Sequence, residues 1–159
     1  MTGGADDFKW TALRAAPRLV IDSYTRGMTP LFDRVLELLG SVVARTKWWE
    51  DEYGVQTTSR TLIMTDGEDN ESKFTAADVA QVVRDMLAME KHQIFLAGIK
   101  GYDNIDFKAL GKSMGLPDHC IDTVPSDEKA IRSWLELRSQ SAVSAPAPAG
   151  APDLGFGNN

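Results

Sequence analysis

The sequence predicts an α/β fold in which a parallel sheet has helices on both faces. Three short apolar runs, at Thr61–Thr65, Gln93–Ile99 and His119–Val124, have the length and composition of buried strands. Segments with apolar residues at helical spacing lie before, between and after these runs. Because strands that alternate with helices are joined by crossover connections, we expect three parallel strands whose spatial order follows their order in the sequence.

One domain is expected over residues 17–140, with an extension before it and a tail after it. The extension, residues 1–16, is acidic near its start and has the spacing of a short amphipathic turn over Phe8–Ala16. Leu19–Ile21, at the start of the domain, is a brief strand-like run. The tail, residues 141–159, is rich in Ala, Pro and Gly and has no apolar periodicity, so we expect it to be disordered.

Four helices are expected, and most of their starts carry a local signal. The first should be capped by Thr29, with the following proline as its first residue, and should continue through the Trp-Trp pair. The second should begin at Thr75, where an acid three residues further on makes a capping box. The third is expected over Ile105–Met114, and the last should be capped by Ser126.

Composition excludes several classes of partner. The chain has 23 acidic and 17 basic residues, a net charge of −6, and no cluster of Lys and Arg, so nucleic acid and anionic membrane are not expected partners. No apolar run reaches membrane-spanning length, and the start of the chain lacks the basic and apolar parts of a signal peptide. The single Cys120 excludes an internal disulfide. We therefore expect a cytoplasmic protein.

The loop after the first strand is the candidate site. Arg60–Ser72 reads R-T-L-I-M-T-D-G-E-D-N-E-S, which places Asp66 at the carboxyl end of that strand and Gly67 in the turn that follows. Ligands bind at the carboxyl ends of parallel strands, and a carboxylate among hydroxyls suits Mg²⁺. In the alternative interpretation, Asp-Gly only ends the strand and the acids are solvated.

Two motifs together resemble a known family. G-M-T-P-L-F-D-R-V at Gly27–Val35, a long helix, and then T-L-I-M-T-D-G-E-D-N are similar to the second half of a von Willebrand factor type A (vWA) domain, over about Tyr24–Leu137. The resemblance implies a three-layer, Rossmann-like fold and a metal-ion-dependent adhesion site built from three loops. Thr29 matches the second loop and Asp66 the third, so these two are the implied metal ligands.

The first half of the family pattern is missing. No D-x-S-x-S precedes these motifs, because Tyr24 stands where the first Ser should be in Asp22–Arg26. In the family, the missing first strand pairs beside the T-D-G strand, so the resemblance implies an N-terminally incomplete sheet with an open edge beside Leu62–Met64, which invites another chain. A truncated reading frame, a split domain completed by a partner, and a degenerate domain all fit. Two of the usual five protein oxygens remain, so we expect weak Mg²⁺ binding by the isolated chain.

The resemblance implies a non-enzymatic protein-interaction module, of the kind found in intracellular bacterial or phage proteins. A protein partner would bind through an acidic side chain at the metal or through the open sheet edge. One alternative is a structural or assembly subunit without metal. Another is a Mg²⁺-dependent phosphohydrolase that uses Asp66 with Glu68 and Asp69. It ranks lower, because it needs a nucleophilic Asp two residues before another acid, and Met64 holds that position. No glycine-rich phosphate loop is present.

Overall fold

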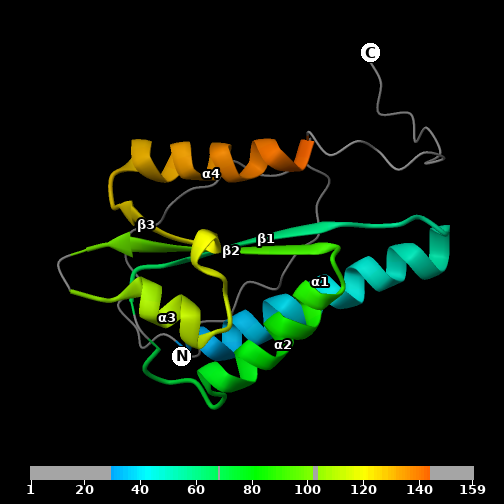
Figure 1. Cartoon of the computed structure of the whole chain (residues 1–159), viewed down its shortest axis with the longest axis horizontal. Helices are drawn as coiled ribbons and strands as arrows, with labels where there is room; N and C mark the ends of the chain where they lie inside the picture. The colour runs from blue at the N-terminus through cyan, green and yellow to red at the C-terminus, as the bar shows by residue number, and fades with distance from the viewer. Residues whose placement is uncertain (1–29, 68, 102–103, 144–159) are drawn as a thin grey trace, which may run out of the picture.

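The computed structural model describes residues 30–67, 69–101 and 104–143 (Figure 1). Within these ranges the sheet has three strands, β1 (Ser59–Thr65), β2 (His92–Lys100) and β3 (Ile121–Pro125), in the order β1-β2-β3. Both pairs are parallel, and the register places Ile63 beside Leu96 and Leu96 beside Ile121. The predicted α/β class, the three parallel strands and their spatial order are therefore confirmed.

Four α-helices alternate with these strands in the described part of the chain: α1 (Leu31–Tyr53), α2 (Ala76–Ala88), α3 (Phe107–Ser113) and α4 (Glu128–Val143). Figure 1 shows α4 along one side of the sheet and α1, α2 and α3 along the other. The side chains of β2 alternate accordingly. Ile94 and Leu96 pack in a cluster with α1 and α2, whereas Phe95 and Ala97 pack in a second cluster with Ile131 and Trp134 of α4.

The start of α1 differs from the prediction by one residue. Leu31 is the first helical residue and Pro30 occupies the N-cap position, where it makes no side-chain capping hydrogen bond. Thr29, predicted as the cap, lies outside the described residues. The helix passes through Trp48 and Trp49 as predicted and ends at Gly54, whose φ of 63° is readily adopted only by glycine.

The helix α2 begins as predicted, and α3 begins two residues late. Thr75 Oγ1 accepts a hydrogen bond from Asp78 N, and the Asp78 carboxylate accepts one from Thr75 N at 2.7 Å, which completes the capping box. The cap of α3 is Asp106, which accepts a hydrogen bond from Ala109 N at 2.9 Å. Because Asp106 caps the helix, the residue before it lies outside α3.

The predicted starts of α4 and β3 are corrected. Ser126 does not cap α4, because the Asp127 carboxylate accepts the hydrogen bond from Ala130 N at 2.9 Å. Both residue types are good caps, and the sequence alone did not distinguish between neighbours. The strand β3 begins at Ile121, two residues later than predicted, because Asp118–Cys120 form a 3₁₀ turn.

Several predictions fall on residues that the structure does not describe. They are the extension over residues 1–16, the strand-like run at Leu19–Ile21, and the tail beyond residue 143. Among the helices that are described, none is both long enough and apolar enough to cross a bilayer.

Candidate functional site

One edge of β1 is free in the described sheet, because β1 pairs with β2 alone. Its side chains alternate between the two faces. Thr61 and Ile63 are buried on the face that α1 covers, whereas Leu62 is half-buried and Met64 is 38% exposed on the other face. The Thr61 hydroxyl is buried and has no hydrogen-bond partner among the described residues. Within the described residues, β1 therefore has a free edge and, beside it, a buried hydroxyl without a hydrogen-bond partner.

Asp66 lies directly after β1, at the carboxyl end of the sheet, as predicted. Its side chain is exposed, and no described residue forms a hydrogen bond or ion pair with it. The turn that follows is built by Thr65, whose Oγ1 donates to Gly67 O at 2.9 Å and accepts from Gly67 N at 3.3 Å. With respect to the described residues, Asp66 is therefore available to bind a ligand. Its predicted companion Thr29 lies outside the described residues.

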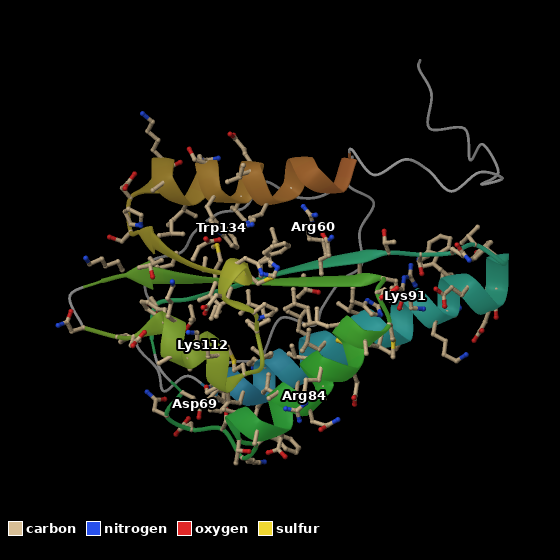
Figure 2. The ribbon with its side chains drawn as sticks, viewed as in Figure 1. Arg60, Asp69, Arg84, Lys91, Lys112 and Trp134 are labelled. Carbon is tan, nitrogen blue, oxygen red and sulfur yellow. The ribbon has the colours of Figure 1, made fainter. Side chains whose placement is uncertain are left out.

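A second acid of this loop, Asp69, has a structural role that the sequence does not reveal. The Asp69 carboxylate accepts a hydrogen bond from Phe32 N at 3.2 Å, and Ser72 Oγ accepts one from Asp33 N at 3.1 Å. These amides belong to the first turn of α1, whose N–H groups have no partner within the helix. Figure 2 shows Asp69 near the start of α1. The loop thus supplies the cap that Pro30 does not provide.

The contact between the loop and α1 is reciprocal. Asp33 Oδ1 accepts hydrogen bonds from Phe74 N at 3.0 Å and from Lys73 N at 2.9 Å. The Phe74 N–H is the largest cause that holds the pKa of Asp33 below its usual value, and the Lys73 N–H adds to it. Ser72 in turn donates to the Asp69 carboxylate from both its N–H and its hydroxyl. Three side chains therefore hold the loop on the first turn of α1.

This arrangement decides how well the described residues fit Mg²⁺. Asp33 and Asp69 are occupied by backbone N–H groups, whereas Asp66 accepts no hydrogen bond from a described residue. In the part of the chain that the structure describes, no three His, Cys, Asp or Glu side chains are grouped closely enough to hold a metal ion. One carboxylate offsets little of the dehydration of a doubly charged ion. The described residues alone do not fit a Mg²⁺ site.

On the α4 face, Arg60 of β1 lacks a carboxylate partner among the described residues. Its Nε donates to Gln93 Oε1 at 2.9 Å, and its Nη1 donates to the backbone oxygen of Arg138. Its guanidinium lies 5.3 Å from the centre of the Phe95 ring. Arg60 forms no ion pair with a described residue, whereas Arg138 beside it pairs with Asp122. Figure 2 shows Arg60 between the sheet and α4.

A Ser-His pair lies at the opposite end of the strands. Ser59 Oγ is 2.7 Å from His92 Nδ1, and the imidazole is buried with no partner for its Nε2 among the described residues. Burial, and then the nearby Lys91, lower the pKa of His92, so the ring is neutral at physiological pH. A catalytic pair needs a third group to orient the base, and no described residue is bonded to the other ring nitrogen. The pair has the features of a buried structural contact.

Comparisons with protein-family models, with curated proteins and with solved structures find no match for this chain.

Proposed function

We propose that the chain is a non-enzymatic protein-interaction module of the vWA type, with a Rossmann-like, three-layer sheet that another segment or chain completes at β1. The free edge of β1 is the observation that carries this proposal. The buried Thr61 hydroxyl, without a partner among the described residues, supports it, because a neighbouring strand would bring a hydrogen-bonding group to it. So does the position of Asp66, which lies exposed at the end of the same edge.

Completion at β1 would also complete the metal site. A first loop of the D-x-S-x-S type adds a carboxylate and two hydroxyls beside Asp66, which is the kind of ligand set that Mg²⁺ prefers. Thr29 and Asp66 would be this chain's contribution. The partner is then a protein, and the net charge of −6 argues against nucleic acid and anionic membrane. We place the module in the cytoplasm.

The test is a calorimetric titration with Mg²⁺ of the chain itself and of a chimera that carries the first half of a vWA domain. We expect little or no binding by the chain and measurable binding by the chimera. Thr29→Ala should weaken the binding by the chimera. A chimera that folds and binds no Mg²⁺ would overturn the metal part of the proposal.

A second candidate function is a structural or assembly subunit without metal. The structural roles of Asp69, which caps α1, and of Asp33, which binds the loop amides, favour it, because these acids already have structural partners. It predicts that the supplied first half binds at β1 and that Mg²⁺ has no effect on this binding.

A further inference from the structure

Four features of β1 and its end would gain from a further partner, judged from the described residues alone. Arg60 has no carboxylate partner, the buried Thr61 hydroxyl has no hydrogen bond, Met64 is a large apolar side chain that is 38% exposed, and Asp66 has no partner, all with respect to the described residues. They lie along seven consecutive residues at the free edge. A single strand that pairs with this edge is the simplest structure that would satisfy them together.

We propose that this strand is β1 of a second copy of the chain, paired antiparallel about a twofold axis at Ile63. Opposite residues then have numbers that add to 126, twice 63. Arg60 faces Asp66 of the second copy, Thr61 faces Thr65, and Leu62 faces Met64. Each pair occurs twice because the interface is isologous. This inference rests on the proposed function, in which the free edge of β1 binds a completing segment. It identifies the second copy as the occupant of that edge when no completing segment is bound.

Each facing pair is chemically matched. Arg60 and Asp66 carry opposite charges, and such cross-strand pairs stabilise a sheet. The Thr61 hydroxyl can donate to Thr65 Oγ1, which has a second lone pair besides the one that accepts from Gly67 N. Leu62 and Met64 are both apolar, and their contact would cover the exposed methionine. In this one register Arg60 gains a carboxylate, and the other three features find a partner.

The neighbouring registers do not match in this way. With the axis at Leu62, the Arg60 guanidinium faces Met64 and the Thr61 hydroxyl faces Ile63, so the charge and the hydroxyl stay unpaired. With the axis at Thr61, the two Thr61 hydroxyls face each other, but Arg60 faces Leu62 and Asp66 lies beyond the facing strand. With the axis at Met64, Asp66 faces Leu62 and Thr65 faces Ile63. The axis at Ile63 pairs charge with charge, hydroxyl with hydroxyl and apolar with apolar side chains.

The arrangement has a consequence for the proposed site. The three described strands of each copy then form one continuous sheet, and Asp66 is held by Arg60 of the second copy. A completing segment must then displace the second copy before Asp66 can bind a ligand. The dimer would therefore cover both the sheet edge and Asp66 until the completing segment binds.

The test uses two charge reversals, Arg60→Asp and Asp66→Arg, and light scattering over a dilution series. Each variant alone places like charges opposite each other, so we expect the dissociation constant of its dimer to rise roughly tenfold above that of wild type. An equimolar mixture restores both ion pairs, since each acid of the first variant then faces an arginine of the second. The mixture should therefore dimerise with a dissociation constant within about threefold of wild type. Because Asp66→Arg leaves the contacts of Arg60 with Gln93 and Arg138 intact, it also controls for misfolding.

Disulfide trapping locates the register independently. A mixture of the Leu62→Cys and Met64→Cys chains should form a mixed disulfide on mild oxidation, because directly opposite Cβ atoms lie about 4.5–5.5 Å apart. A mixture of Thr58→Cys with Met64→Cys is the control, since these residues are far apart in this register. Three results would overturn the inference. The first is a wild-type chain that stays monomeric at every concentration. The second is a mixture of the two charge-reversal variants that is no more dimeric than either variant alone, and the third is equal disulfide trapping in the Thr58→Cys control. None of these readouts involves Mg²⁺, so their failure leaves the titration of the chimera as a separate test of the proposed function.

Discussion

Two acids three residues apart in the same loop should respond differently to truncation. Asp69→Ala removes the acceptor for Phe32 N, together with the group that holds Ser72 against Asp33 N. Loss of a helix cap costs about 0.5–2 kcal/mol, typically about 1 kcal/mol. Asp66→Ala removes an exposed side chain without a partner among the described residues, so it should change the free energy of unfolding by less than about 0.5 kcal/mol.

The assay is urea unfolding followed by circular dichroism, with the two variants and wild type measured side by side. A loss of about 1 kcal/mol in a chain of this size lowers the melting temperature by roughly 2–4 °C. Asp69→Asn is the matched control, because its amide oxygen still accepts from Phe32 N and Asn caps helices about as well as Asp. If Asp66→Ala costs as much as Asp69→Ala, or if Asp69→Asn costs as much as Asp69→Ala, then Asp69 does not stabilise the protein by capping α1.

Two further predictions concern the core and the pH dependence of stability. A Cβ added at Gly98 would overlap the Phe107 ring, so Gly98→Ala should cost roughly 1–3 kcal/mol or more. A Cβ added at Gly40 would meet no atom within 4 Å, so Gly40→Ala should not destabilise the protein, and thermal melts of both variants check this. Burial lowers the pKa of His92 from its usual 6.5, so the unfolded chain binds this proton more readily than the folded one. The stability contributed by the neutral ring is present above about pH 6.5 and is lost as the pH falls through the folded-state pKa. In His92→Gln the free energy of unfolding should therefore fall less steeply over this acidic range, which unfolding curves measured at several pH values would show.

The predictable part of the fold is the part set by local pattern. The strands were found because short apolar runs bounded by polar residues carry their own signal, and the capping box of α2 because Thr75 and Asp78 lie three residues apart. Asp66 was placed correctly at the end of β1 for the same reason, since T-D-G directly follows an apolar run.

The cap of α1 was not predictable in this way. Asp69 and the Phe32 amide are separated by 37 positions, and Ser72 and the Asp33 amide by 39. No local spacing rule links them, because they meet only after β1 has returned beside α1. Asp69 lies in an acid-rich loop beside Asp66, and for this reason the phosphohydrolase alternative includes it, whereas the structure shows Asp69 as the cap of α1. The one available signal is Pro30, which leaves the start of α1 without a side-chain cap of its own.

The proposed site at Asp66 depends on a segment supplied at β1. The most direct measurement is the paired Mg²⁺ titration of the chain and of the completed chimera, repeated with Asp66→Ala and with Asp85→Ala as an exposed acid away from the site. We expect binding by the chimera alone, abolished by Asp66→Ala and retained in Asp85→Ala. Tight binding by the chain as it stands, unaffected by Asp66→Ala, would contradict it.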